Sequence, residues 1–314
     1  MHQNSQIKIC ERNIYIKKMK TKVIVTGGCG FIGSHLVDLL VENNFDVNVV
    51  DNISTSKNNK YIHEKAKYIY LDITEDIQKL KEAFSGAKYI FHLAAFARVV
   101  PSIHDPITFH NINVNGSLNV FLAAKEVGAK VIFSSSSSVY GNPIELPVKE
   151  THRLDSMCPY ALHKQIGEEY LELFNKIYSL NSVSLRYFNV FGERAPREGA
   201  YVPVVGIFLR QKEAGEPLTI VGDGLQNRDF VHAKDVARAN LAAALDERNG
   251  AFIYNVGSGK SLSVIEIANK ISKNTVHITE RFEYKNARSD VSKIKQELNW
   301  EYKIELMDWL NSYV

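Results

Sequence analysis

The stretch KVIVTGGCGFIGSHL (residues 22–36) joins an apolar, β-branched run to a segment with helical spacing of apolar residues, and glycines lie between the two. Gly27, Gly30 and Gly33 are spaced G-x-x-G-x-x-G, and Gly28 with Gly30 and Gly33 also satisfies G-x-G-x-x-G. Glycines at this spacing permit a tight turn and a close approach of the backbone to a ligand. Because the helix that follows offers free N–H groups, the stretch predicts a strand–turn–helix unit that binds a pyrophosphate.

The same alternation of apolar runs and helical segments continues to about residue 189. The predicted strands are residues 22–26, 46–51, 66–73, 88–95, 130–135 and 182–189. The predicted helices between them are residues 31–44, 75–84, 106–127 and 159–180. Strands that alternate with helices indicate βαβ units, so we expect an α/β fold with a doubly wound parallel sheet of the Rossmann type.

The rhythm changes in the second half of the chain. Residues 192–229 are richer in glycine, proline and arginine, and no regular element is predicted there. Residues 231–245 predict a helix, residues 251–257 predict a short strand, and the tail from residue 261 holds two more helical patterns. A shift of this kind is typical of a second, less regular unit.

We therefore expect two domains. Residues 21–187 form the nucleotide-binding domain, and residues 231–257 return to it. Residues 188–314 form mainly a smaller C-terminal α/β substrate domain. Residues 1–20 are expected to be a flexible N-terminal extension.

Composition narrows the class of protein. The chain has 314 residues with 45% hydrophobic and 23% charged content, and its net charge of +3 comes without a dense basic block, so no nucleic-acid partner is expected. No apolar stretch approaches the roughly 20 residues that span a bilayer, and the N-terminus lacks a signal-peptide core, so no membrane association is expected. Three cysteines without a C-x-x-C pair, and no H-x-x-x-H pair, predict no metal site and a cytoplasmic, reducing location.

An acidic residue ends the second predicted strand. Asp51 follows Gly33 by 18 residues, the position from which a carboxylate binds the adenosine ribose hydroxyls of NAD. The same charge would repel the 2′-phosphate of NADP, so NAD is the expected cofactor. The alternative is an ordinary turn aspartate that starts the following loop. Asp72 lies at the end of the predicted strand over residues 66–73 and is expected to contact the adenine.

Five serines, SSSSSVYG (residues 134–141), follow the apolar end of a predicted strand. Downstream, Tyr160 and Lys164 are spaced i and i+4 on a predicted helix and therefore share one face. A lysine ammonium beside a tyrosine hydroxyl favours the phenolate, so we expect a lowered pKa for Tyr160 and a role as general base. Since active sites of open α/β sheets lie at the carboxyl ends of the strands, the serines are predicted to line the cleft. A surface pair on a helix is the alternative for Tyr160 and Lys164.

Together these features resemble the extended short-chain dehydrogenase/reductase family, and within it the nucleotide-sugar epimerases such as the UDP-glucose 4-epimerases. The resemblance runs from about residue 22 to the C-terminus. The segments that carry it are VTGGCGFIGSHL, the strand-end DN, LDI, HLAA, NVNGSLN, SSSSSVYG, PYALHK, LRYFNVFG, GDGLQNRDFVHAKDVA and DVSKIKQELNW.

The resemblance implies roles for individual residues. Ser136 contacts the substrate, Tyr160 is the base and Lys164 is its partner. The implied NAD-binding residues are Gly27, Gly30, Phe31, Ile32, Gly33, Asp51, Asn52, Asp72, Ile73, Leu93, Ala94, Ala95, Asn113, Tyr160 and Lys164. The implied binding residues for a UDP-linked sugar are Ser136, Ser137, Tyr160, Asn189, Val221, Arg228, Arg281 and Ala287. Among them, Asn189, Arg228 and Arg281 are expected at the diphosphate.

The implied reaction is reversible inversion at a sugar carbon, most often C4, through a 4-ketosugar, with NAD regenerated in each turnover. Relatives pair the two helices that correspond to residues 106–127 and 159–180 across a two-fold axis, so a homodimer is expected. The alternative is that the apolar faces of these helices only cover the sheet.

Several departures bear on the substrate and on rival activities. Ser137 and Ser138 stand where 4,6-dehydratases carry an Asp-Glu pair, and the glutamate of the decarboxylases is also missing. Ala97 replaces a lysine frequent in UDP-glucose 4-epimerases, and Ala287 would leave room for an N-acetyl group, so UDP-glucose and UDP-N-acetylglucosamine both stay open as substrates. Dehydration, decarboxylation and epimerisation at another carbon remain alternatives. So does a non-catalytic NAD-binding regulatory protein, although such a protein would be expected to lose Tyr160 and Lys164.

Overall fold

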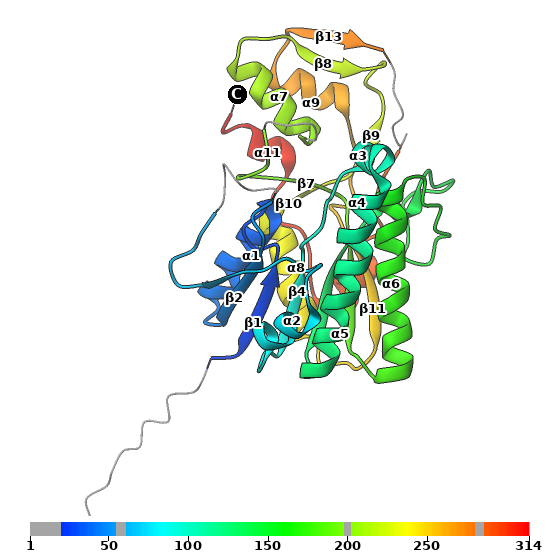
Figure 1. Ribbon diagram of the computed structural model, residues 1–314. Coiled ribbons are helices and arrows are strands. Elements are labelled where there is room, and N and C mark those ends of the chain that lie inside the picture. The colour runs from blue at the N-terminus through cyan, green and yellow to red at the C-terminus, as the bar shows by residue number, and fades with distance from the viewer. Residues whose placement is uncertain (1–19, 55–60, 198–201, 280–285, 314) are drawn as a thin grey trace, which may run out of the picture.

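A seven-stranded parallel sheet forms the centre of the computed structural model, which describes residues 20–54, 61–197, 202–279 and 286–313 (Figure 1). Its strand order is β11–β6–β5–β4–β1–β2–β3, and every neighbouring pair is parallel. The strands are β1 (Lys22–Thr26), β2 (Asp46–Asp51), β3 (Lys67–Tyr70), β4 (Tyr89–His92), β5 (Lys130–Ser136), β6 (Ser182–Tyr187) and β11 (Ala251–Val256). The expected doubly wound α/β fold is confirmed.

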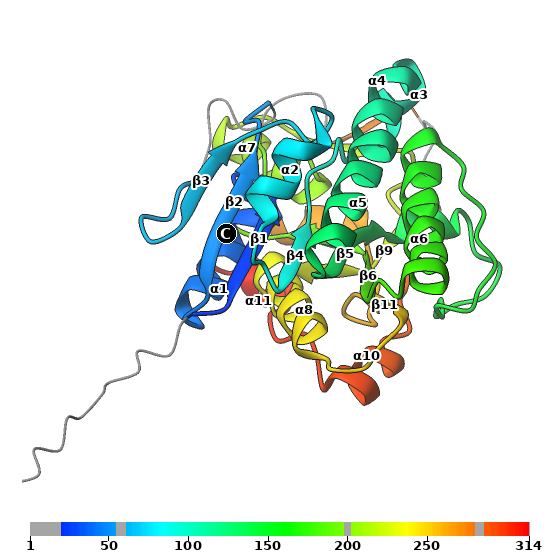
Figure 2. The same cartoon turned by 60° about the horizontal axis from the view of Figure 1, so that its bottom comes forward.

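Helices cover both faces of this sheet (Figure 2). One face carries α1 (Phe31–Glu42) and α8 (Ala233–Leu245), and the other carries α2 (Ile77–Phe84), α5 (Ser117–Val127) and α6 (Pro159–Tyr178). Strand β1 shows why a continuous apolar run suits this position. Val23 and Val25 belong to the core under α1 and α8, whereas Ile24 between them belongs to the core under α2, α5 and α6. Both sides of the strand are buried, as in other parallel sheets.

The helical segment before β5 differs from the prediction of one helix over residues 106–127. It consists of α4 (Pro106–His110), a π-helical turn η1 (Asn111–Gly116) and α5, and it is preceded by the unpredicted α3 (Val99–His104). At the π turn the backbone of Gly116 lies so close to Ile73 that a Cβ would come within 2.8 Å of its side chain. Any larger residue at this position would require the side chain of Ile73 to move.

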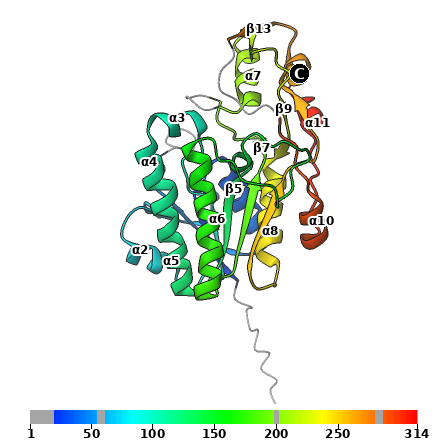
Figure 3. The same cartoon turned by 90° about the vertical axis from the view of Figure 1, so that its right-hand side faces the viewer.

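Most of the remaining elements lie beyond the carboxyl ends of the strands (Figure 3). Three small sheets pair β7 (Asn189–Phe191) with β10 (Phe230–His232), β8 (Leu218–Val221) with β13 (Thr275–Ile278), and β9 (Asn227–Arg228) with β12 (Leu262–Ser263). The helices here are α7 (Val204–Glu213), α9 (Val264–Ile271) and α11 (Leu306–Leu310), whereas α10 (Ser292–Leu298) packs beside β11 of the large sheet. Phe208, Ile220, Ile267 and Leu310 anchor a separate apolar core.

Three sequence expectations need correction in this part of the chain. The sequence assigned no element to residues 192–229, but they contain α7 and β8, which bury one face each in that separate core. The predicted strand over residues 182–189 is two strands, because the chain leaves the large sheet after Tyr187 and Asn189 pairs instead with Phe230. The tail from residue 261 holds three helices where two were expected. Among the described residues, no helix is both long and apolar enough to cross a membrane.

Candidate active site

A cavity of about 880 Å³ lies where the carboxyl ends of the parallel strands meet the C-terminal elements. Its volume is in the range of cofactor and small-molecule sites. The glycine turn after β1 forms one end of its wall, and the serines after β5 line it together with Tyr160 of α6. Arg228 and Ala287, from the C-terminal elements, line it as well.

The glycine turn has the geometry that its spacing predicts. Gly27 has a φ of +73°, and a Cβ there would lie 2.6 Å from the backbone nitrogen of Ala94. A Cβ on Gly33 would lie 2.2 Å from the carbonyl oxygen of Gly27, so the first turn of α1 packs directly onto the loop. Gly30 is the N-cap of α1 and has no side chain that could accept from the N–H groups of the first helical turn. The N–H groups of the first helical turn are therefore available to an anion in the cavity.

The carboxylate of Asp51 is held in place by two backbone N–H groups. Cys29 donates to its Oδ2 at 3.0 Å and Ile53 donates to its Oδ1 at 2.7 Å. Each carboxylate oxygen keeps a further acceptor site, so a pair of ribose hydroxyls can still bind. Burial opposes ionisation of the neighbouring Asp72, but hydrogen bonds from Thr74 and Asn52 outweigh it and lower the pKa of Asp72. The glycine turn and the fixed Asp51 together fit the two ends of the ADP half of NAD.

Successive serines of the row serve different partners. The hydroxyl of Ser134 shares a hydrogen bond of 3.0 Å with the phenol of Tyr187, and the hydroxyl of Ser135 donates to Glu168 at 2.5 Å. Ser136 accepts from the backbone N–H of Ser138 at 3.2 Å and from its hydroxyl at 2.9 Å. Because both lone pairs of the Ser136 oxygen are used, its own proton is free to be donated.

Tyr160 and Lys164 lie one turn apart on α6, and both line the cavity. Burial raises the pKa of Tyr160 to about 12, and a hydrogen bond from Ser136 opposes the shift. The expected lowering of this pKa is therefore absent from the protein alone. Burial lowers the pKa of Lys164 to about 7, against the pull of Glu168, and its ammonium nitrogen lies 4.8 Å from the ring centre of Phe133. Desolvation, which the i, i+4 spacing does not reveal, dominates both groups.

A hydrogen bond from α6 to α3 fixes the first turn of α6. The N–H of Tyr160 is one of the first-turn donors of α6 that no residue of the helix can satisfy. It donates at 3.1 Å to the hydroxyl of Ser102, which is fully buried on α3 and donates in turn to the carbonyl oxygen of Val99 at 2.5 Å. The start of α6 is thereby held against α3, whose preceding residue Arg98 lines the cavity.

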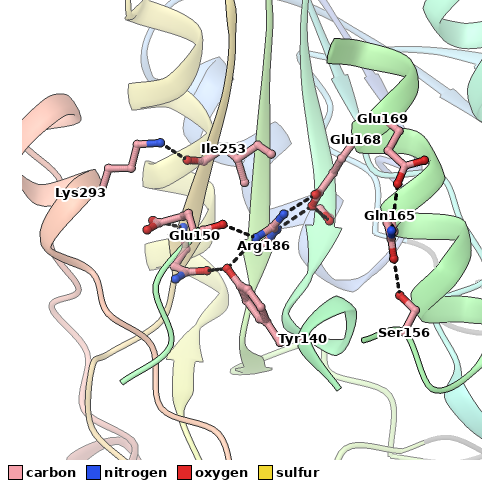
Figure 4. Close-up of polar contacts among 11 residues, drawn as sticks. Tyr140, Glu150, Ser156, Gln165, Glu168, Glu169, Arg186, Ile253 and Lys293 are labelled. Atoms are coloured by element: carbon pink, nitrogen blue, oxygen red, sulfur yellow. Dashed lines mark hydrogen bonds and ion pairs between the residues drawn. The ribbon is translucent and has the colours of Figure 1, made fainter. Parts of the chain in front are cut away.

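A buried ion pair between Arg186 and Glu168 lies next to the serine row (Figure 4). Arg186 of β6 binds both carboxylate oxygens of Glu168 on α6, at 2.9 and 2.6 Å, and the two side chains are 3% and 4% exposed. The same guanidinium donates at 2.8 Å to the phenol of Tyr140, which donates to Asn255 of β11 at 2.7 Å. Since Ser135 also binds Glu168, the network joins β5, β6, β11 and α6. Tyr140 follows the serines and closes this network, and it also lines the cavity.

His92 fixes the loop that follows β4. It is fully buried, and burial lowers its pKa to about 3, so the imidazole is neutral. Ser117 donates to the carbonyl oxygen of Asn113 at 2.6 Å and must therefore accept from Nε2–H of His92, at 2.9 Å. Nδ1 then accepts from the hydroxyl of Thr26 at 2.8 Å. This chain of hydrogen bonds sets one tautomer and ties β1, β4 and the π turn together.

The opposite end of the cavity is formed by C-terminal residues. The side-chain amide of Asn189 donates to the carbonyl oxygen of Asp229 at 2.8 Å, which leaves its second N–H for a ligand. Arg228 lines the same wall, as do Asn286 and Ala287, and the N–H of Ala287 donates to Asn227 at 3.1 Å. A guanidinium and an amide donor suit a phosphate group.

Most of the predicted site residues come together in this one cavity. The wall includes Gly27, Gly30, Phe31, Ile32, Gly33, Asp51, Asn52, Asp72, Ile73, Leu93, Ala94, Ala95, Ser136, Ser137, Tyr160, Lys164, Asn189, Arg228 and Ala287. Asn113 and Val221 do not line it. Asn113 instead binds the backbone N–H and carbonyl of Phe96 with its side-chain amide, at 2.8 and 2.9 Å. Arg281 lies outside the described residues.

Sequence reasoning missed three arginines of the wall, Arg98, Arg194 and Arg197. Arg194 forms an ion pair of 2.7 Å with Asp38 on α1, and its guanidinium lies 5.0 Å from the ring centre of Tyr61. These arginines lie between regular elements, outside any spaced motif. The enrichment of residues 192–229 in arginine could have indicated Arg194 and Arg197, but it does not extend to Arg98.

Comparison with known proteins places this geometry in a family. Residues 23–257 match the NAD dependent epimerase/dehydratase family. A protein of Methanocaldococcus jannaschii, provisionally named a UDP-glucose 4-epimerase, is 37% identical over 300 residues that cover 93% of this chain and 97% of that protein. The UDP-N-acetyl-alpha-D-glucosaminuronate decarboxylase of Bacillus cytotoxicus is 32% identical over 318 residues, covering 93% of this chain and 98% of that protein.

A solved structure agrees with both sequence and fold. The UDP-N-acetylglucosamine 4-epimerase from Methanobrevibacter ruminantium M1, in complex with UDP-N-acetylmuramic acid, superimposes with a TM-score of 0.86 at 35% identity. The match covers 94% of this chain and 100% of that chain. The protein is therefore an enzyme of the NAD-dependent epimerase/dehydratase family, the extended short-chain dehydrogenases/reductases.

Proposed function

We propose that the protein is an NAD-dependent 4-epimerase of a UDP-sugar, acting on the UDP-glucose/UDP-galactose or the UDP-N-acetylglucosamine/UDP-N-acetylgalactosamine pair. The observation that carries the proposal is the convergence of Ser136, Tyr160 and Lys164 on one cavity wall, between the glycine turn and Arg228. Relatives named as epimerases of UDP-sugars support the substrate class.

Each residue has a defined task in this reaction. Bound NAD would supply the hydride acceptor for the sugar carbon and a positive charge that favours the phenolate of Tyr160. Tyr160 takes the proton of the 4-hydroxyl, and Ser136 donates a hydrogen bond to the same oxygen. Lys164 stabilises the phenolate with its charge. After the 4-ketosugar has turned over, the hydride returns to the opposite face of C4 and Tyr160 returns the proton to the oxygen, so the inverted sugar leaves with the same atoms.

The cavity wall also bears on the rival activities. Elimination of water needs an acid and a base beside the hydroxyl of Ser136, but Ser137 and Ser138 occupy these positions. The hydroxyl of Ser138 already donates its proton to Ser136. Dehydration is therefore disfavoured. Decarboxylation stays the second candidate because a relative of 32% identity is a decarboxylase.

A small residue at the sugar end of the cavity wall supports the proposal that an N-acetyl group fits there. Ala287 is a small residue and packs against an apolar cluster of Val139, Tyr140, Val148 and Phe188. We further propose that residues 21–187 with 231–257 hold the cofactor, and that residues 188–314 mainly hold the nucleotide sugar.

Product analysis tests the proposed function. The purified protein is incubated with UDP-glucose and, separately, with UDP-N-acetylglucosamine without added NAD, and proton NMR follows the products. We expect galacto-configured signals, because the cofactor is regenerated in each turnover and can remain bound. A parallel incubation contains UDP-glucuronate. A product that has lost the carboxylate would favour decarboxylation. No conversion of any of these substrates after NAD addition would contradict the proposal.

We also propose a homodimer through the face of α3, α4 and α6. This face exposes Ile103, Ile107, Leu162, Leu173 and Ile177, which are between 46% and 75% exposed. Neighbouring exposed apolar side chains of this size are typical of interfaces. Light scattering after size-exclusion chromatography should give twice the 35.5 kDa of one chain. A monomer at micromolar concentration would contradict this assembly.

A further inference from the structure

Asp229 lies between β9 and β10, at the corner where Arg228 meets the cavity. Its side chain is fully buried, and no described ion pair involves it. Burial raises the pKa of Asp229, whereas hydrogen bonds from Ser289 and Ser258 favour its charged form. A buried carboxylate without a cation is costly unless several donors surround it.

The carboxylate collects donors from two distant segments. Its Oδ1 accepts from the N–H and the hydroxyl of Ser258, both at 2.7 Å. Its Oδ2 accepts from the N–H of Gly259 at 3.0 Å, and from the N–H and the hydroxyl of Ser289 at 2.9 and 2.5 Å. Five donors therefore converge on one side chain, and the packing leaves no spare room. A Cβ on Gly257 would lie 2.3 Å from the hydroxyl oxygen of Ser289.

The backbone of the same residue holds a third segment. The carbonyl oxygen of Asp229 accepts from the backbone N–H of Asn189 at 3.0 Å and from its side-chain amide at 2.8 Å. The side chain of Asn189 is therefore oriented by Asp229, and Arg228 is attached to Asp229 as the preceding residue of the chain. Ser289 follows Ala287 by two residues, so its bonds to the carboxylate place the sugar end of the wall.

We propose that Asp229 is the positioning residue of the substrate wall: it fixes Arg228, Asn189 and Ala287 relative to one another by holding three chain segments at once. This proposal rests on the proposed function, since it takes the ligand of this wall to be a UDP-sugar. Asp229 itself does not line the cavity, so it acts only through these neighbours.

Two serines provide a matched pair of test variants. Ser258 and Ser289 each give one hydroxyl and one N–H to Asp229, but Ser289 alone belongs to a segment that lines the cavity nearby. Ser289→Ala and Ser258→Ala should lower the melting temperature to a similar extent. Ser289→Ala should weaken binding of UDP-glucose and UDP-N-acetylglucosamine about tenfold, whereas Ser258→Ala should change it less than about twofold.

The measurement is titration calorimetry with UDP, UDP-glucose and UDP-N-acetylglucosamine, together with the NAD content of each purified variant. Asp229→Asn should weaken all three ligands at least as much as Ser289→Ala, because its amide N–H would face the donors of Ser289 or Ser258. NAD content should stay unchanged throughout. Equal effects of the two serine variants on ligand binding, or stability loss with unchanged ligand affinity, would overturn the proposal. Failure of the wild type to bind any of the three ligands would instead contradict the proposed function, and this inference with it.

Discussion

Ser136 donates a hydrogen bond from its hydroxyl to the phenol oxygen of Tyr160, across the gap between the end of β5 and the first turn of α6. The direction of this bond follows from the two bonds that Ser136 accepts from Ser138. A donor to the phenolate stabilises the ionised form of Tyr160 relative to the neutral form. Ser136 has a single proton, so in the free enzyme this proton favours the phenolate of Tyr160, and in the proposed reaction it turns to the sugar oxygen.

Removing this donor should move the pH dependence of the reaction. In Ser136→Ala the pKa of Tyr160 rises because its phenolate loses a hydrogen bond, so the rise of kcat/KM with pH should shift to higher pH by about one unit. Steady-state rates between pH 6 and 10 measure the shift. Ser137→Ala, a change in the next residue of the row, is the control and should leave the profile in place. A Ser136→Ala profile that coincides with that of the wild type would refute the role of this bond.

Loss of the tyrosine hydroxyl should abolish most of the chemistry without affecting the cofactor. Tyr160→Phe is expected to reduce turnover by about 10² to 10⁴-fold because no other group on the wall is placed to move the 4-hydroxyl proton. NAD content of the purified variant should be unchanged. Tyr170→Phe, which changes a tyrosine of the same helix outside the cavity, is the control. Near-normal turnover of Tyr160→Phe would sink the mechanism.

The carboxylate of Asp51 should govern both affinity for NAD and discrimination against NADP. Asp51→Ala is expected to weaken NAD binding by about tenfold or more, because two ribose hydroxyls lose a charged acceptor. NADP binding should weaken less or improve, since the variant no longer repels the 2′-phosphate. Fluorescence titration of cofactor-stripped protein gives both constants. Unchanged affinity for NAD would remove Asp51 from the cofactor site.

His92 should make the folded protein sensitive to acid. Its pKa falls from 6.5 to about 3 on folding, so the unfolded chain binds a proton between these values and the folded protein does not. Stability from this group is complete above pH 6.5 and is lost as the pH falls towards 3, by up to about 1.4 kcal/mol per pH unit. In His92→Gln the free energy of unfolding should depend less steeply on pH.

Urea unfolding at pH 4, 5 and 6.5 compares the slopes of His92→Gln and the wild type. The exposed His104 offers a control, and His104→Gln should keep the slope of the wild type. His92→Gln starts from a lower stability because the bonds to Thr26 and Ser117 are lost. If the stability of His92→Gln fell with pH as steeply as that of the wild type, the histidine would not be the sensor.

The sequence predicted those parts of the site that local spacing determines. The glycine turn, the serine row and the pair of Tyr160 and Lys164 each lie within one short segment, and a strand end or a single helix turn fixes their geometry. The parallel sheet followed from the alternation of elements for the same reason. The unpredicted α7 shows the limit, because its apolar face has meaning only against α9 and β8.

The residues that the sequence did not indicate act through distant partners. Glu168 of α6 forms an ion pair with Arg186 of β6, and Asp229 accepts a hydrogen bond from Ser289, 60 positions later in the chain. No periodicity connects such pairs before the chain has folded. The pKa of Tyr160 shows the same limit, because spacing reveals the lysine one turn away but not the burial that raises this pKa.

The central claim is that hydride leaves C4 of a UDP-sugar and returns to the same carbon while Tyr160 moves only the hydroxyl proton. UDP-glucose deuterated at C4 tests it most directly, with proton NMR and mass spectrometry of the product after incubation in ordinary water. The account predicts a galacto-configured product that keeps its deuterium at C4, and no such product from Tyr160→Phe over the same time. Replacement of the C4 deuterium by solvent hydrogen, or a product altered at another carbon, would contradict it.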